Sequence, residues 1–232
     1  MSAQRNSDSV PAASSSSWQS ARLLVTDEFA APPVILRVGD SVIGTLGNFS
    51  ASTGKAKSKK TFNVCAIVAA AMTGGTVLNY SASLPPRKRR ILYVDTEQSR
   101  FHCKRVLCRI LRLAGLPTDA HPPLLEFLCL RGYATKERLR KIEEAIYDLD
   151  NLGLVVIDGI RDLAHDINSP GEATDLITKL MQWTDERRIH IHTVLHLNKG
   201  DDNTRGHLGT ELNNKAETVL QITKDDFERD IS

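Results

Sequence analysis

The feature that most limits the fold is an alternation of short, uniformly apolar segments with longer amphipathic ones. A segment that is apolar at every position, such as Leu154–Ile157, fits a strand that is buried on both faces. Amphipathic segments of about 12–17 residues fit helices that cover a sheet, and strands that alternate with helices form right-handed crossovers. The pattern predicts an α/β fold with a mostly parallel central sheet flanked by helices. Ligands are expected beyond the carboxyl ends of the strands.

The expected elements begin shortly after Asp40. Strands are predicted at Val42–Phe49, Ile91–Asp95, Leu125–Leu130, Leu154–Ile157, Ile189–Leu197 and Thr218–Thr223. Helices are predicted at Lys60–Met72, Gln98–Ala114, Lys136–Leu149 and Ala173–Arg187. The stretch Asn198–Thr210 is polar, contains three glycines and lacks apolar periodicity, so we expect it to be a loop.

Composition is that of one globular domain plus a tail. The 232 residues are 41% hydrophobic and 25% charged, and a chain of this length can bury one sizeable core. Residues 1–17 include seven serines and are predicted to be a disordered tail, whereas residues 18–232 are predicted to form the folded domain. The chain ends soon after its last expected strand, so truncation of the domain at the C-terminus is one hypothesis.

Several other classes of protein are disfavoured. No apolar run approaches the roughly 20 residues that span a bilayer, and the N-terminus has no apolar signal core. The four cysteines include no CxxC pair, which favours core residues in a reducing compartment over a disulfide frame. The net charge of +2 does not by itself indicate a nucleic-acid binder. We therefore expect a cytoplasmic protein with no membrane segment.

A lysine-rich segment between a predicted strand and a predicted helix fits the phosphate-binding pattern GxxxxGK[ST]. Lys60 would reach the β- and γ-phosphates of ATP, and the Thr61 hydroxyl would bind Mg²⁺. Lys59 stands where the pattern has its second glycine, so a solvated lysine-rich loop remains an alternative. The predicted ATP-binding residues are Gly54, Lys55, Ala56, Lys57, Ser58, Lys59, Lys60 and Thr61.

Two predicted strands end in acidic residues, which suit the remaining chemistry of a nucleotide triphosphate. Asp158 is the candidate Mg²⁺ ligand together with Thr61, and the alternative is an aspartate that caps an Asp-Gly turn. Glu97 is the candidate base for the attacking water. Asp95 is a candidate for pinning the loop or capping the next helix. Alternatively, both acids only complement the dipole of that helix.

These segments, in this order, resemble a known family. The strand ends Asp95-Thr-Glu-Gln-Ser99, Asp158 and His196-Leu-Asn-Lys199 follow the phosphate loop as they do in the RecA-like ATPase core, in its DnaB/RepA-type helicase branch. The similarity covers about Val34–Thr223 and is greatest to AAA-type ATPases of bacterial plasmids and mobile elements. It implies a RecA-like P-loop fold and ATP-dependent, helicase-like work on DNA in plasmid or mobile-element replication or mobilisation.

The resemblance also implies roles for individual residues. Glu97 would be the catalytic glutamate acting with Lys60, Asp158 would hold Mg²⁺, His196 would sense the γ-phosphate, and Arg105 would pack on the adenine. The loop after His196 would face DNA, expected to be single-stranded. The candidate phosphate contacts there are Lys199, Arg205 and His207. A homo-oligomer is expected, with a hexamer as one candidate.

Three competing interpretations remain. A nucleotide-sensing DNA-binding or scaffold protein with little ATP turnover would result if Lys59 impairs the phosphate loop. A small-molecule kinase would need a lid, and no arginine-rich lid segment is visible in the sequence. His190 and His192 share one strand face at a spacing that suits zinc, but no cysteine or acid at ligand spacing accompanies them.

Overall fold

The computed structural model describes residues 17–197 and 206–223. The chain divides into two compact units, Met1–Ala31 and Pro32–Ser232. In the first unit, the described residues contain one short 3-10 helix, η1 (Ser17–Ala21). The boundary expected between residues 17 and 18 stays a prediction, because residues 1–16 lie outside the described part of the chain.

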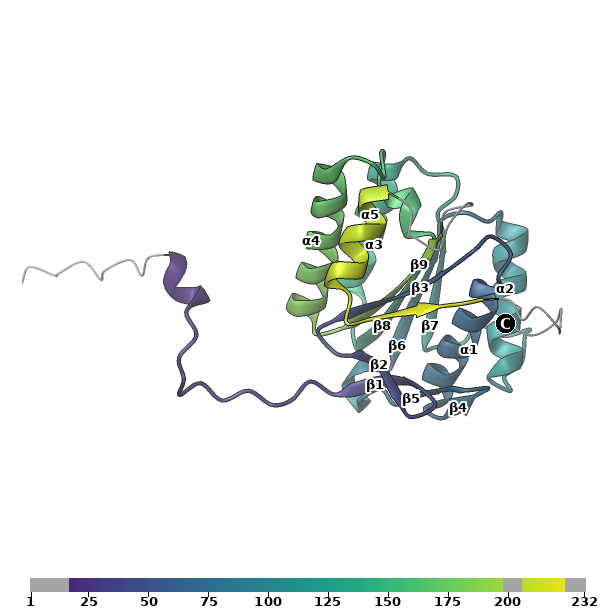
Figure 1. The fold of residues 1–232 in the computed structure, drawn as a ribbon. Coiled ribbons are helices and arrows are strands. Elements are labelled where there is room, and N and C mark those ends of the chain that lie inside the picture. The colour runs from purple at the N-terminus through teal and green to yellow at the C-terminus, as the bar shows by residue number, and fades with distance from the viewer. Residues whose placement is uncertain (1–16, 198–205, 224–232) are drawn as a thin grey trace, which may run out of the picture. The chain divides into compact units, whose positions relative to one another are not determined.

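The centre of the larger unit is a six-stranded sheet in the order β10-β3-β9-β8-β6-β7 (Figure 1). Every neighbouring pair in this sheet is parallel. Every residue of β8 is buried, which is why its segment is uniformly apolar up to the final aspartate. The strands are β3 (Phe49–Gly54), β6 (Arg90–Asp95), β7 (Leu125–Cys129), β8 (Leu152–Asp158), β9 (His190–His196) and β10 (Thr218–Gln221).

Helices cover both faces of the sheet (Figure 1). One core lies between the sheet and the pair α1 (Lys60–Thr73) and α2 (Arg100–Leu113). The other core lies beneath α3 (Thr135–Asp148), α4 (Pro170–Arg187) and α5 (Gly206–Lys215). The described residues of this unit also form two short 3-10 turns, η2 (Pro86–Lys88) and η3 (Ile160–Leu163). The predicted α/β fold, with a mostly parallel central sheet flanked by helices, is confirmed.

A second sheet, antiparallel and in the order β2-β1-β5-β4, was not predicted. The predicted strand Val42–Phe49 is wrong because it joins two separate strands: β2 ends at Thr45 and β3 begins at Phe49. The chain turns between them at Gly47, whose φ of 90° favours glycine. The strands of this sheet are β1 (Val34–Val38), β2 (Ser41–Thr45), β4 (Thr76–Val77) and β5 (Tyr80–Ala82).

The expected loop at residues 198–210 is wrong over residues 206–210, which form the start of α5. Leu208 and Leu212 of this helix are buried, and the Leu208 N–H donates to the carbonyl oxygen of Ile167 at 3.2 Å. Tertiary packing rather than apolar periodicity therefore stabilises α5, so the sequence pattern does not reveal it. Residues 198–205 lie outside the described residues.

The other predicted strands and helices are confirmed, with ends that shift by no more than about three residues, as is usual for pattern-based boundaries. Within the described ranges, no helix is both long enough and apolar enough to cross a bilayer.

Candidate nucleotide-binding site

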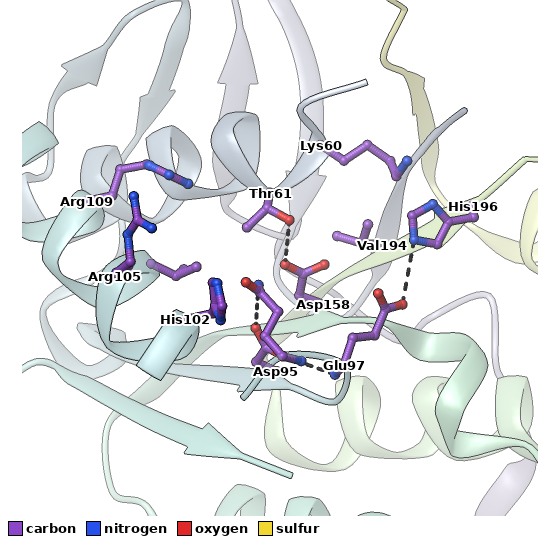
Figure 2. A pocket seen from close by; sticks show the side chains of 12 residues that line it. Lys60, Thr61, Asp95, Glu97, His102, Arg105, Arg109, Asp158, Val194 and His196 are labelled. Atoms are coloured by element: carbon purple, nitrogen blue, oxygen red, sulfur yellow. Dashed lines mark hydrogen bonds and ion pairs between the residues drawn. The ribbon is translucent and has the colours of Figure 1, made fainter. Parts of the chain in front are cut away.

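Six of the predicted site residues line one cavity at the carboxyl ends of the parallel strands (Figure 2). The cavity has a volume of about 320 Å³. Four separate segments line it: the start of α1, the turn and helix after β6, and the ends of β8 and β9. The predicted residues in its lining are Lys60, Thr61, Glu97, Arg105, Asp158 and His196.

The phosphate loop consists of Lys55–Lys59 and joins β3 to α1. Gly54, the last residue of β3, has no room for a side chain. A Cβ there would lie 2.4 Å from the carbonyl oxygen of Ile222 and 2.6 Å from Ser58 Oγ. Glycine therefore allows the chain after β10 to pass close to the base of the loop. The side chain of Ser58 is buried, whereas Lys55, Ala56 and Lys57 are exposed.

Lys59, which replaces the second glycine of the pattern, adopts the backbone conformation that favours glycine. Its φ is 64°, and Lys57 has a φ of 65°. Lys59 is the N-cap of α1 and makes no side-chain capping hydrogen bond. A non-glycine residue in the left-handed region costs roughly 1–2 kcal/mol. The substitution is thus accommodated with backbone strain and without a change of loop length.

Lys60 folds back onto the phosphate loop. Its Nζ donates to the carbonyl oxygens of Gly54 and Lys55, both at 2.8 Å, and to Ser58 Oγ at 3.4 Å. Burial lowers the pKa of Lys60, and two nearby carboxylates oppose this effect. A second cavity, of about 380 Å³, is lined by Lys57–Phe62 and shares Lys60 with the first. The ammonium group therefore lies where the loop and the main cavity meet.

Asp158 ends β8 and faces Thr61 at the start of α1 (Figure 2). Thr61 Oγ1 donates to Asp158 Oδ2 at 3.0 Å, and the Tyr93 hydroxyl donates to the same oxygen at 2.9 Å. Burial raises the pKa of Asp158 to about 6, and these hydrogen bonds oppose the increase. A hydroxyl and a carboxylate oxygen are hard donors, and Mg²⁺ sites commonly use few protein ligands beside nucleotide phosphates. Thr61 and Asp158 therefore fit a Mg²⁺ ion that arrives with a nucleotide.

Asp95 pins the turn after β6, which was one of its two predicted roles. Its Oδ1 accepts hydrogen bonds from the N–H groups of Glu97 at 3.0 Å and Gln98 at 2.7 Å. Its Oδ2 accepts from Gln98 Nε2 at 2.8 Å. Asp95 is buried, so these three donors satisfy a carboxylate that solvent does not reach. The turn projects the next acid, Glu97, into the cavity.

Glu97 and His196 both line the cavity, and their side chains point toward each other (Figure 2). The distance from His196 Nε2 to Glu97 Oε1 is 3.6 Å. This contact lowers the pKa of Glu97, burial opposes it, and the charges of Lys60 and Arg161 lower the pKa further. Glu97 is therefore ionised at neutral pH, which is the state that a general base requires.

Thr96 and Gly159, neither of which was predicted as a site residue, connect the two acidic strand ends. Thr96 Oγ1 donates to the carbonyl oxygens of Asp158 at 3.2 Å and Gly159 at 2.9 Å. Gly159 has a φ of 105°, and a Cβ there would lie 2.2 Å from Thr96 Oγ1 and 3.0 Å from Glu97 Cγ. The turn that carries Glu97 thus rests directly on the end of β8. The only sequence signal for this contact is the glycine after Asp158.

The remaining predicted contacts, with adenine and with DNA, involve Arg105, His207 and two residues outside the described part of the chain. Arg105 lies on α2 and lines the cavity beside Arg109, whose guanidinium is 5.9 Å from the ring centroid of Phe62. His207 is exposed on α5. Lys199 and Arg205 lie outside the described residues. The predicted contacts with adenine and with DNA therefore stay predictions.

The other two histidines of β9 lie in the core between β3 and β9. His190 Nδ1 bonds the carbonyl oxygen of Thr45 at 2.9 Å, and His190 Nε2 bonds Ser50 Oγ at 2.7 Å. Ser50 Oγ bonds His192 Nδ1 at 2.8 Å, and His192 Nε2 bonds Ser52 Oγ at 2.9 Å. Burial lowers the pKa of His190 to about 4 and that of His192 to about 3. Across the described residues, no three His, Cys, Asp or Glu side chains are grouped to hold a metal ion.

Comparison with known proteins identifies the family. A search of curated proteins found no match. A family model described as an AAA domain matches residues 19–202, which is more than half of the chain. The matched range includes the phosphate loop and all six predicted residues that line the cavity. The chain therefore belongs to the AAA domain family and is a P-loop ATPase.

Proposed function

We propose that this ATPase binds ATP and Mg²⁺ in the cavity at the carboxyl ends of the strands and couples hydrolysis to helicase-like work on DNA. The observation that supports the proposal most strongly is the convergence of Lys60, Thr61, Glu97, Asp158 and His196 on one cavity. These residues come from segments as much as 136 positions apart, and they supply a cation, oxygen donors and a base, which is the set that phosphoryl transfer uses.

Nucleotide binding is assigned to the phosphate loop and the start of α1. The residues of Gly54–Thr61 surround the phosphates, and the N–H groups of the first helical turn attract them. The Lys60 ammonium, now bonded to carbonyl oxygens, exchanges those partners for phosphate oxygens. Thr61 and Asp158 would hold Mg²⁺, which neutralises charge on the phosphates when it is bound. Arg105 lines the cavity from α2, and we assign it to packing against the adenine base.

Hydrolysis is assigned to Glu97. Its ionised carboxylate orients a water molecule and takes the proton that the water loses on attack. His196 lies beside this carboxylate at the end of β9, and the chain continues from there towards Lys199 and Arg205. Loss of the γ-phosphate would change the Glu97–His196 contact and so the segment that follows β9, which we propose touches single-stranded DNA together with His207.

The wider role is proposed from the family. Plasmid or mobile-element replication or mobilisation is the setting that the resemblance implies. RecA-like motors usually complete each site with an arginine or lysine from a neighbouring subunit, so we propose a homo-oligomer, with a hexamer as the candidate assembly. A scaffold with little turnover is the second candidate, because the strained backbone of Lys59 is a specific feature that would weaken nucleotide binding.

Steady-state ATPase measurements on the full chain, with and without single-stranded DNA, test the proposal. We expect Mg²⁺-dependent turnover that DNA stimulates, and we expect the stimulation to fall as salt weakens phosphate contacts. Lys60→Ala serves as the inactive control. DNA binding with no turnover above that control would favour the scaffold, and turnover that DNA leaves unchanged would remove DNA from the proposal.

A further inference from the structure

We propose that Tyr93 is a positioning residue that orients the Asp158 carboxylate and thereby sets the Mg²⁺ requirement of nucleotide binding. The inference rests on the proposed function, since it takes Asp158 as the residue that meets Mg²⁺. No motif in the sequence marks Tyr93, which belongs to the apolar part of β6.

The geometry places the Tyr93 hydroxyl on one particular oxygen. β6 and β8 are parallel neighbours in which Asp95 lies opposite Asp158, and Tyr93 lies two residues earlier on the same face as Asp95. Its hydroxyl reaches Asp158 Oδ2 at 2.9 Å, the oxygen that also accepts from Thr61 Oγ1 at 3.0 Å. Hydrogen bonds from Tyr93 on β6 and Thr61 on α1 thus hold Oδ2 of Asp158. Its other carboxylate oxygen, Oδ1, is left for a ligand in the cavity.

The ring of Tyr93 is itself held in place. The residue is fully buried, and its ring stacks on Phe127 of β7 with centroids 4.6 Å apart and planes 12° from parallel. A buried phenol hydroxyl needs a hydrogen-bond acceptor, and Asp158 supplies it. The hydroxyl therefore cannot swing away without losing both the stack and its acceptor.

This arrangement matches the way in which outer-shell partners act on metal ligands. A carboxylate fixed by a neighbouring donor presents its free oxygen in one orientation, so the cation does not have to order it on binding. Without the tyrosine hydroxyl, Asp158 would keep Thr61 as its side-chain donor and could rotate about its own side-chain bonds. Removal of such partners typically weakens metal affinity by about 10–100-fold.

The test is Tyr93→Phe in the full chain, which removes the hydroxyl and keeps the stacked ring. Binding of a fluorescent ATP analogue is titrated at increasing Mg²⁺ and again with the metal chelated. We expect the Mg²⁺ concentration at half-maximal enhancement of binding to rise by about 10-fold or more. Affinity for the metal-free nucleotide should stay within about 2-fold, because Lys60 and the loop are unchanged.

Tyr80→Phe is the matched control. Tyr80 is also buried in the core beneath α1, and its hydroxyl donates to Asn63 Oδ1 at 3.1 Å, away from Asp158. This control should leave the Mg²⁺ requirement unchanged. A second variant, Phe127→Leu, removes the stack but keeps the hydroxyl and should raise the requirement by a smaller factor.

An unchanged Mg²⁺ requirement in Tyr93→Phe, or an equal increase in Tyr80→Phe, would overturn the inference. If the wild-type protein shows no Mg²⁺-dependent nucleotide binding, the proposed function itself fails. These results are distinct, because the inference alone fails when the wild-type protein binds nucleotide in a Mg²⁺-dependent way but Tyr93→Phe either matches wild type or is matched by Tyr80→Phe.

Discussion

Replacing Glu97 by glutamine is expected to lower ATP turnover by roughly 10²-fold or more while ATP still binds. Glutamine keeps the size of the side chain and its ability to hydrogen-bond, but it cannot take a proton from the attacking water. Its contact with His196 can also persist, because an amide oxygen still accepts a hydrogen bond. Steady-state turnover and the dissociation constant for ATP, measured in the same buffer, separate the two effects.

The matched control for this substitution is Glu144→Gln. Glu144 is an exposed acid on α3 that pairs with Arg140, and it lies outside the cavity. Its replacement removes the same charge from the protein and should leave turnover unchanged. Wild-type turnover in Glu97→Gln would show that Glu97 is not the base and would remove the strongest link to the RecA-like mechanism.

Acidification is expected to destabilise the fold by several kcal/mol between about pH 6.5 and 4 because of His190 and His192. Their folded pKa values of about 4 and about 3 lie below the usual value of 6.5. In this interval the unfolded chain binds protons that the folded chain excludes. The stability that the neutral histidines contribute is therefore present above pH 6.5 and is lost as the pH falls towards the folded pKa values.

Two other acidic groups do not remove this effect. Glu217 raises the pKa of His190, but burial outweighs it. Asp158, whose pKa is raised to about 6, acts in the opposite direction, because its protonation in acid favours the folded state and offsets part of the loss. The pKa values of the two histidines are shifted further than that of Asp158, so their destabilising effect in acid is the larger one.

Urea unfolding at pH 7 and at pH 5 measures the loss, and His192→Asn identifies its source. Asparagine can hydrogen-bond but does not titrate, so the pH dependence should become shallower by roughly half. His121→Asn is the control, since His121 is exposed beside Glu126 and should not alter the slope. A pH dependence that is the same in His192→Asn and wild type would mean that the buried pair does not control acid stability.

The central sheet could be predicted because the apolar residues that mark each buried strand are consecutive in the sequence. A buried parallel strand such as β8 must be apolar throughout, and the acid at its end must lie at the edge where ligands gather. The same reasoning predicted that Lys60, Glu97 and Asp158, which are distant in the sequence, lie at one edge of the sheet. The family comparison identifies a P-loop ATPase, and the roles of these three residues stay predictions.

The remaining features depend on contacts between segments, which a local pattern does not record. The small antiparallel sheet has strands of only two to five residues, and the strand β2 runs almost directly into β3, so the two read as one. α5 forms because Leu208 and Leu212 find a core to pack against. Tyr93 lies within β6 and Thr96 in the turn after it, and neither has a sequence signal of a site until the fold places β8 beside them.

The most direct test of the account is ATP binding by Lys60→Ala compared with Lys55→Ala. Lys60 lies where the loop meets the cavity, whereas the side chain of Lys55 is exposed at the start of the loop. If the segment Gly54–Thr61 binds ATP with Lys60 at the phosphates, Lys60→Ala should weaken Mg²⁺–ATP binding by a few kcal/mol, on the order of 10²-fold. Lys55→Ala should then change the affinity by only a few-fold. Equal weakening by the two substitutions, or undiminished binding by Lys60→Ala, would contradict the account.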